Sequence, residues 1–431
     1  MKSISNIPGT SKKRVVIVGA GFAGLKVVRN LISSNDFQIV LLDKNNYHQF
    51  QPLFYQVATA GLEPSAISFP LRKVMQGESR VHFRIADVEE VVPRENMLYT
   101  NIGKLRYDYL IMSTGVDTNY FGNKNIEENA VPMKSVSEAI FLRNKIIRNY
   151  ERALDETEPD EVKALMNVVV VGGGPTGVEL SGALAEMRRF ILPKDYPELD
   201  FDLMKVYLLE AGDQLLGGMS DSASNKARDY LKSLGVDVRL NTMVEDFDGF
   251  SVKLKDSESE LKTYTLIWAA GVSGKQISGF LEQDYMRGNR LIVDKYNLVK
   301  GYNNIYALGD ACYMETDDYP KGHPQVAQVA IQQAQNLVRN LKKSIKGRQL
   351  KEFSYLDKGS LATIGRHLAV ADLPFIKFQG FLAWILWLLV HLFSIVGVKN
   401  KLVIFLNWAW NYLTYDQSLR LLIIHKTFGK K

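Results

Sequence analysis

The sequence predicts an α/β protein with two Rossmann-like domains, the second inserted in the first, followed by a C-terminal apolar helical region. A strand, a glycine-rich turn and a helix occur twice in this order, with turns at residues 19–24 and 172–177. A chain of 431 residues is long enough for two domains of one design, each with its own core. Residues 376–431 differ in composition from the rest, which predicts a separate region at the C-terminus.

The first copy has the order of elements that a dinucleotide-binding turn requires. An apolar strand at residues 14–18 leads into the glycine turn, and residues 25–32 have helical apolar spacing. The first glycine permits the tight bend, the second lets a pyrophosphate approach the backbone, and the third lets the helix pack on the strand. A second strand, 37–42, ends at Asp43, whose carboxylate can accept hydrogen bonds from a ribose. This order favours a nucleotide site over a purely structural turn.

The second copy repeats these elements. Residues 167–171 form the strand, a long helix is expected over 178–192, and a strand at 205–209 ends at Glu210. Glu210 suits the free ribose 2′-OH of NADH, because NADPH would call for an arginine that residues 211–214 do not supply.

Further landmarks recur in both copies. Residues 108–116 and 265–272 are apolar strands that end in small residues and a glycine. Before each of them, at 81–107 and 236–262, polar and apolar residues alternate between turn signals, which predicts a small antiparallel meander. The repeat therefore covers whole domains.

After the second copy the chain is expected to return to the first domain. A strand at 304–308 ends in Gly309 and Asp310, a helix is expected from Pro324 to about residue 341, and residues 353–370 alternate like a strand. The predicted first domain comprises 12–118 and 275–345, the second 119–274, and the C-terminal region 346–431.

The net charge of +6 is confined to the C-terminal region. Residues 376–431 contain seven Lys or Arg against one Asp, which accounts for the whole of it. Basic charge without acidic offset predicts an anionic partner surface. The residues between these charges are apolar and aromatic, so we expect lipid and no nucleic acid.

The apolar stretch of the C-terminal region spans residues 380–398, between Lys377 and Lys399. Its length is at the lower limit for a membrane span, and two shorter apolar stretches follow, 402–413 and 418–424. Aromatic residues of the kind found at membrane interfaces gather here: Trp384, Trp387, Trp408, Trp410, Tyr412 and Tyr415. A buried dimer or domain contact is the alternative, because a helix that is hydrophobic all round can also belong to a core.

Cys312 is the only cysteine, so neither an intramolecular disulfide nor a dithiol redox pair can form. The six histidines show no close metal-ligand spacing, and no metal site is expected. The N-terminus lacks the apolar core of a secretory signal, so we expect the folded body in the cytoplasm or an equivalent reducing compartment.

Taken together, the two glycine turns with their acids, residues 113–115 and Gly309-Asp310 resemble the two-dinucleotide-binding-domain flavoproteins. More narrowly, residues 51–58 (QPLFYQVA), 59–63 (TAGLE), 172–180 (GGGPTGVEL) and 327–332 (AQVAIQ) resemble the type II NADH:quinone oxidoreductases. The resemblance covers nearly the full length. The related disulfide reductases and sulfide:quinone reductases need paired cysteines and are excluded.

The resemblance implies FAD in the first domain and NADH in the second. The residues expected to bind FAD are Gly19, Gly21, Phe22, Ala23, Gly24, Asp43, Thr114, Gly115, Gly309 and Asp310. Those expected to bind NADH are Gly172, Gly174, Pro175, Thr176, Gly177, Glu179, Glu210, Ala270 and Gly271. The cofactors carry the reaction, and the protein positions them.

The resemblance also implies that Glu179 and Gln328 are catalytic, with Glu179 near the nicotinamide and flavin and Gln328 in the quinone pocket. Gln332, one helical turn after Gln328, and Ile331 would complete that pocket. The alternatives are structural: Glu179 as a first-turn carboxylate that stabilises its helix, a solvated glutamine face, and Ile331 as ordinary core.

We expect a flavoenzyme of the respiratory chain that oxidises NADH and passes two electrons through FAD to menaquinone or ubiquinone, without pumping protons. The resembled family is monotopic, so the tail helices are expected to lie in one leaflet, on the cytoplasmic face of the inner membrane. A homodimer is expected. The alternatives are a soluble reductase of an electron-carrier protein and a non-catalytic NADH-sensing flavoprotein.

Overall fold

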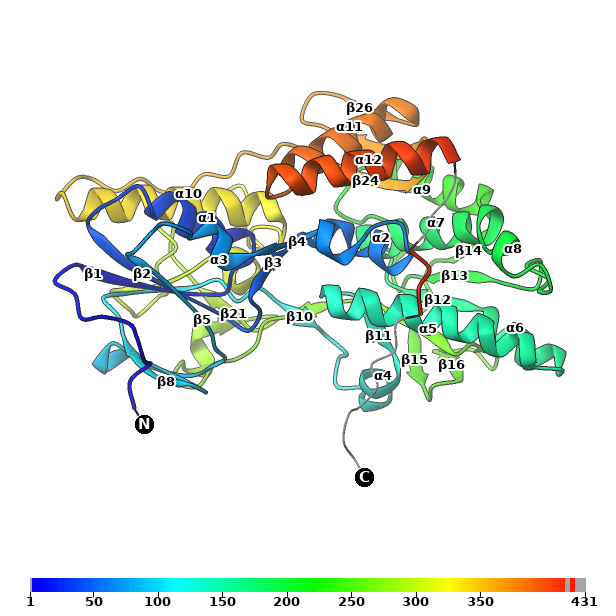
Figure 1. Cartoon of the computed structure of the whole chain (residues 1–431), viewed down its shortest axis with the longest axis horizontal. Coiled ribbons are helices and arrows are strands. Elements are labelled where there is room, and N and C mark those ends of the chain that lie inside the picture. The colour runs from blue at the N-terminus through cyan, green and yellow to red at the C-terminus, as the bar shows by residue number, and fades with distance from the viewer. Residues whose placement is uncertain (1, 415–418, 423–431) are drawn as a thin grey trace. The chain divides into compact units, whose positions relative to one another are not determined.

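The computed structural model describes residues 2–414 and 419–422, and its contacts divide the chain into two compact units (Figure 1). The first unit comprises Met1–His48, Phe69–Asp117 and Val272–Asp357, and the second Gln49–Ser68, Thr118–Gly271 and Lys358–Lys431. Residues 49–68 and the C-terminal region thus belong with the second glycine turn. The predicted limits of the cofactor domains stay a prediction.

The first unit is built on a five-stranded parallel sheet with the strand order β22-β9-β1-β2-β5. Its strands are β1 (Lys13–Val18), β2 (Phe37–Asp43), β5 (Val81–Ile85), β9 (Tyr109–Met112) and β22 (Ile305–Ala307). The central strands are apolar on both faces because both faces are covered, as in doubly wound α/β folds. Helices α1 (Phe22–Leu31) and α10 (Ala327–Ser344) pack against each other.

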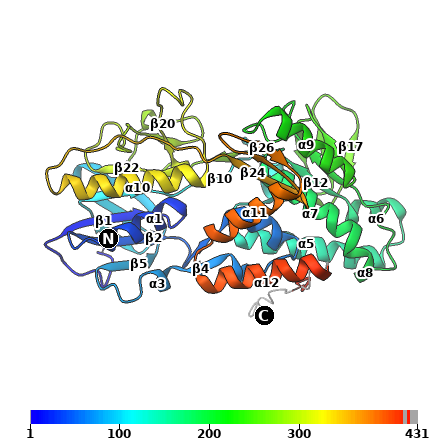
Figure 2. The ribbon, with the colours of Figure 1, turned by 90° about the horizontal axis from the view of Figure 1, so that it is seen from above.

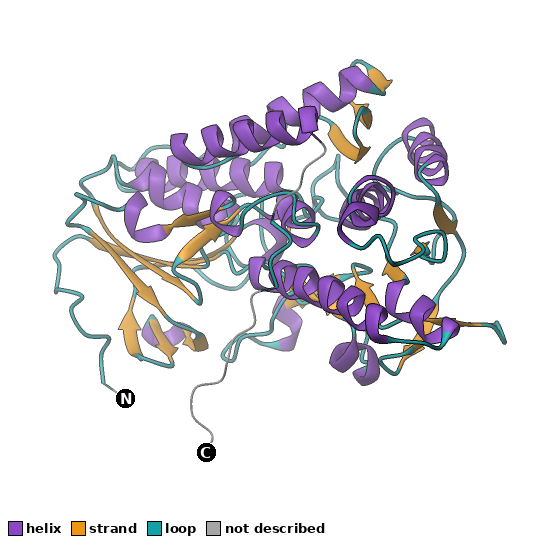
Figure 3. Cartoon of the chain, turned by 45° about the vertical axis from the view of Figure 1, so that its right-hand side comes forward, coloured by secondary structure: helices purple, strands orange, loops and turns teal. Residues whose placement is uncertain are grey.

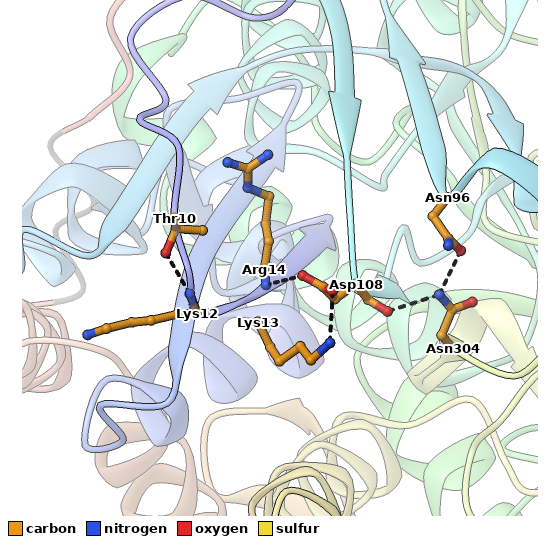
Figure 4. A network of polar contacts seen from close by, with 7 residues as sticks. All are labelled: Thr10, Lys12, Lys13, Arg14, Asn96, Asp108 and Asn304. Carbon is orange, nitrogen blue, oxygen red and sulfur yellow. Dashed lines mark hydrogen bonds and ion pairs between the residues drawn. The ribbon is translucent and has the colours of Figure 1, made fainter.

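A polar network joins the starts of three neighbouring strands of this sheet (Figure 4). The carboxylate of Asp108, just before β9, accepts a hydrogen bond from the Arg14 backbone N–H of β1 at 2.8 Å. Asn304, just before β22, donates to the Asp108 carbonyl oxygen at 2.9 Å and to Asn96 at 2.8 Å. Asp108 therefore fixes the mutual register of β1, β9 and β22.

The second unit repeats the sheet, with the order β11-β18-β12-β13-β14 and all neighbours parallel. Its strands are β11 (Val131–Pro132), β12 (Val168–Val171), β13 (Val206–Leu209), β14 (Val236–Arg239) and β18 (Thr265–Trp268). Figure 3 shows the strands of each unit in orange and the flanking helices in purple. The predicted fold class is confirmed.

The long helix predicted over 178–192 in the second unit begins and ends a few residues earlier than predicted. Helix α7 (Pro175–Phe190) starts inside the glycine turn, three residues earlier than expected, and α5 (Val136–Asp155) opens with a capping box at Ser135. The shorter helices of this unit are α2 (Phe54–Ala58), α4 (Lys124–Asn129), α6 (Pro159–Met166), α8 (Leu192–Asp195) and α9 (Asp221–Ser233). In the first unit, α10 begins at Ala327 rather than Pro324.

The predicted meanders were wrong in their first strands. β5 and β14 belong to the parallel sheets, and the meanders are β6-β7-β8 (Val88–Val92, Met97–Thr100, Gly103–Arg106) and β15-β16-β17 (Val244–Phe247, Ser251–Leu254, Glu260–Lys262). Both misplaced strands are sheet edges with partly exposed side chains, so their sequences alternate as antiparallel strands do.

The C-terminal part of the second unit is a three-stranded antiparallel sheet followed by two helices (Figure 2). The strands are β24 (Ser360–Gly365), β25 (Leu368–Asp372) and β26 (Lys377–Gln379), and residues 353–359, predicted to be strand, form no regular structure. Helix α11 (Phe381–Ser394) takes up most of the apolar stretch 380–398, which ends at the first residue of α12 (Val398–Thr414).

No helix within residues 2–414 or 419–422 is both long and apolar enough to cross a bilayer. Tyr415 and residues 418, 423 and 424 of the predicted stretch 418–424 lie outside the described residues.

Candidate active site

The glycines of the first turn serve different structural needs. A Cβ at Gly19, which has φ +95°, would overlap the carbonyl oxygen of Ser113, and a Cβ at Gly24 would overlap that of Gly19. At Gly21, by contrast, a Cβ would have no neighbour within 4 Å. Two glycines thus permit close backbone packing, and the third leaves open space where a pyrophosphate can approach.

The second turn has the same geometry. Gly172 has φ +110°, a Cβ there would lie 2.6 Å from the Ala269 carbonyl oxygen, and a Cβ at Gly177 would overlap the carbonyl oxygen of Gly172. Gly174 again faces open space.

Each turn is closed by the acid at the end of the next strand. Asp43 accepts a hydrogen bond from the Ala20 N–H at 2.6 Å, and Glu210 accepts one from the Gly173 N–H at 2.5 Å. Burial raises the pKa of Asp43, while the N–H donors of Asn45 and Ala20 oppose that shift. A carboxylate has capacity for further hydrogen bonds, so these contacts are compatible with ribose binding as well.

The helix that follows each turn presents its first backbone N–H groups without a side-chain cap. Among the described residues, no side chain caps α1 at Gly21 or α7 at Gly174, and neither helix has an acidic residue in its first turn. Their first backbone N–H groups and the helix dipole can therefore bind an anion. Both turns fit the pyrophosphate of a dinucleotide.

The other residues predicted to bind FAD gather at the same edge of the first sheet. Thr114 and Gly115 follow β9, and Gly309 and Asp310 follow β22, its neighbour. The Gly309 N–H donates to the side-chain oxygen of Gln333 at 2.7 Å, inside the unit. Sequence reasoning missed Gln333, which stands directly after the quoted motif 327–332.

The residues predicted to bind NADH gather in the second unit in the corresponding way. Glu210 follows β13, and Ala270 and Gly271 follow β18, at the carboxyl edge that also carries the glycine turn. The position of Glu179 does not fit the alternative of a first-turn carboxylate that stabilises its helix. It lies in the second turn of α7, because the helix begins at Pro175, and its side chain is only 8% exposed.

A cavity of about 610 Å³ lies within the second unit. Its walls come from α2, α7, β24, α11 and α12, and most of its surface is apolar, with Phe190, Ile364, Trp384 and Phe405 among the lining residues. A cavity of this size and character suits a small-molecule ligand. Among the described residues, two carboxyl groups line it, those of Glu179 and Glu186.

Glu179 is the buried acid of this cavity. Burial raises its pKa to about 8, although hydrogen bonds from the Thr363 backbone N–H (3.4 Å) and the Trp387 indole N–H (3.2 Å) oppose the shift. The carboxyl group is therefore mostly protonated at neutral pH and can donate a proton inside an apolar cavity.

The residues predicted for the quinone pocket lie on α10 of the first unit. Gln328 and Gln332 stand one turn apart, and Gln328, Ile331 and Gln332 are half-buried. The Gln332 amide makes two hydrogen bonds with the backbone of Leu356, at 2.9 and 3.0 Å, which gives it a structural role.

Two family models match the chain. The pyridine nucleotide-disulphide oxidoreductase model matches residues 13–334, and the NDH2 C-terminal domain matches residues 358–415.

Curated relatives and a solved structure agree with these models. Type II NADH:quinone oxidoreductase Ndh of Mycobacterium tuberculosis is 34% identical, over 94% of this chain and 89% of its own length. Type II NADH:quinone oxidoreductase of Staphylococcus saprophyticus is 28% identical, over 83% of this chain and 88% of its own length. The structure of NDH2 from Plasmodium falciparum in complex with NADH superposes with a TM-score of 0.88 at 23% identity, covering 96% of this chain and all of that one.

The duplicated nucleotide turns, the matched C-terminal domain and the near full-length relatives point to one family. The chain belongs to the type II NADH:quinone oxidoreductases, flavoenzymes that oxidise NADH, pass two electrons through FAD to a quinone and pump no protons.

Proposed function

We propose that the cavity of the second unit holds the quinone during its reduction and that Glu179 supplies a proton there. The observation that carries this proposal is a mostly protonated carboxyl group in the wall of a largely apolar cavity. A quinone that accepts two electrons must also take up protons, and an acid with a pKa near the working pH is the efficient donor. FAD, when bound, accepts hydride from NADH and passes the electrons on.

The protein's own residues bind and orient the two cofactors in this proposal. The open sides of Gly21 and Gly174 would receive the pyrophosphates of FAD and NADH, and the N–H groups that begin α1 and α7 would neutralise their charge. Glu210 would bind the ribose hydroxyls of NADH. The assignment of Gln328, Ile331 and Gln332 to the quinone stays a prediction.

The tail helices would attach the enzyme to the membrane surface. Large apolar side chains project to solvent from α11 and α12, with Phe393 72%, Val398 85% and Leu413 77% exposed, while Lys399 and Lys401 lie at the start of α12. Such helices bind in the plane of a bilayer by apolar burial and attraction to anionic lipid. This supports peripheral binding; the cytoplasmic face of the inner membrane and the homodimer stay predictions, as does the choice between menaquinone and ubiquinone.

A matched pair of substitutions on α12 tests the role of the cavity. Ala409 lines the cavity, whereas Leu406 is 56% exposed on the same helix and does not. Ala409→Trp should slow reoxidation of the reduced flavin by quinone while NADH still reduces the flavin at the normal rate. Leu406→Trp should leave both steps near normal. Equal quinone kinetics in the two variants would show that the quinone reacts elsewhere.

A further inference from the structure

One face of α7 is shaped to receive the C-terminal sheet. Glu179, Gly182 and Glu186 are spaced by three and four residues and so share this face. A Cβ at Gly182 would overlap the carbonyl oxygen of Ile364, so only glycine lets β24 approach so closely. On either side of this crossing, the backbone N–H groups of Thr363 and Arg366 donate to Glu179 and Glu186, the latter at 2.6 Å.

Helix α11 adds a side-chain contact to the carboxyl group of Glu179. Trp387 is only 1% exposed, and its indole N–H, the single polar group of the side chain, donates to Glu179 at 3.2 Å. The ring is held in place by stacking on His391 at 4.0 Å between centroids and by Tyr55 at 6.4 Å. Its orientation is therefore fixed by packing as well as by the hydrogen bond.

We propose that Trp387 is a positioning residue for quinone reduction, whose indole N–H orients the carboxyl group of Glu179 at the cavity wall and couples its ionisation to the docking of α11. This inference rests on the proposed role of Glu179 as proton donor. It gives the C-terminal region a part in the chemistry, in addition to membrane attachment.

Burial and its hydrogen bonds, rather than a neighbouring cation, set the charge of Glu179. Tyr55 on α2 has a pKa raised well above its usual value by burial, and burial lowers the pKa of His391 on α11 to about 4, so both are neutral near pH 7. Burial also raises the pKa of Glu186, the other acid on α7, which lies beside the guanidinium of Arg366 on β24. Among the described residues, no lysine or arginine pairs with Glu179.

The direction of the effect follows from which form the indole stabilises. An N–H donor favours the charged carboxylate, so the Trp387 hydrogen bond lowers the pKa of Glu179 against the larger effect of burial. Without that donor the pKa rises, and Glu179 stays protonated to higher pH. The decline of quinone reduction on the alkaline side should therefore move to higher pH.

The test compares Trp387→Phe with Trp408→Phe in the FAD-loaded enzyme. Trp408 also lines the cavity, but its indole N–H donates to Gln56 at 2.8 Å. The pH dependence of flavin reoxidation by quinone and the infrared titration of the carboxyl C=O band are measured. Trp387→Phe should raise the midpoints of both titrations by about 1 pH unit, which is the shift expected from the loss of one hydrogen bond to a charged group. Trp408→Phe should leave both midpoints in place, whatever its effect on rate.

Glu179→Gln separates the two levels of the proposal. If this variant keeps the alkaline decline, the proposed role of Glu179 is wrong. If it removes the decline but Trp387→Phe leaves both midpoints at the wild-type pH, only the role of Trp387 is overturned. In the wild-type protein, the NMR shift of the Trp387 indole N–H should follow the same titration and lose it in Glu179→Gln, a readout that holds even if Trp387→Phe does not fold.

Discussion

Glycine serves two different needs within each nucleotide turn, and the structure separates them residue by residue. Gly24 and Gly177 lie where a Cβ would overlap a backbone carbonyl oxygen, whereas Gly21 and Gly174 face open space with φ of −67° and −71°, values that alanine adopts freely. The first kind is required by the fold, and we propose that the second is required by a ligand.

Paired alanine substitutions should therefore give opposite results. Gly177→Ala should destabilise the protein by about 3 kcal/mol, at the upper end for overpacking, because backbone must move. Gly174→Ala should leave the melting temperature nearly unchanged and weaken NADH binding. Calorimetry and NADH titration measure the two effects. Unchanged NADH binding in Gly174→Ala would show that its open side is not a ligand site.

Gln333 should prove important for holding FAD. Its side-chain oxygen accepts the buried Gly309 N–H, so Gln333→Leu leaves that donor unsatisfied at a cost of about 1–3 kcal/mol. We expect a lower melting temperature and partial loss of FAD during purification. Asp310→Ala, which alters the turn residue itself, should lose more FAD. Full FAD retention in Asp310→Ala would remove the assignment of this turn.

At the scale of elements, the tail helices have two faces with different partners. Ala383, Trp387 and Ile404 are buried in the second unit, whereas Val398 and Leu413 are largely exposed. The sequence analysis treated membrane attachment and a buried domain contact as alternatives. The structure assigns the buried contact to one face, and the other carries the proposed membrane surface.

Acidic substitutions on the two faces should separate these roles. Val398→Glu and Leu413→Glu should each change the free energy of unfolding by no more than about 0.5 kcal/mol. Both should nevertheless weaken binding to anionic liposomes in a flotation assay. Ala383→Glu, at a fully buried position, should destabilise the protein strongly. Undiminished flotation of the double variant Val398→Glu/Leu413→Glu would mean that another surface binds lipid.

Salt should divide the membrane affinity of the intact protein into two parts. Binding to anionic liposomes should weaken at high ionic strength because charge attraction is screened, but it should persist because apolar burial is not. Complete release by salt would contradict a contribution from the exposed apolar side chains.

For the whole molecule, the repeated design could be predicted because local patterns carry it. Strand, turn, helix and acid follow each other within a few dozen residues, and β9-β1-β2-β5 of one sheet corresponds to β18-β12-β13-β14 of the other. The grouping of residues 49–68 with the C-terminal region could not be predicted, because it depends on contacts such as Trp408 with Gln56, which are 352 residues apart along the chain.

The sequence likewise predicted only part of the candidate site. The glycines and their acids follow from the turn geometry, but the environment of Glu179 depends on Trp387, 208 residues away, and on a helix that begins earlier than expected. No local pattern marks that pair.

The most direct test of the account is a sequential, anaerobic stopped-flow experiment on the FAD-loaded enzyme. NADH should remove the flavin absorbance and a quinone should restore it. In Glu179→Gln the first step should keep its rate, while the second should slow by about 100-fold or more, the usual contribution of a general acid. A variant that slows only the NADH step, or a quinone that restores the absorbance at the wild-type rate in Glu179→Gln, would contradict the proposal that the cavity of the second unit is where the quinone takes up its proton.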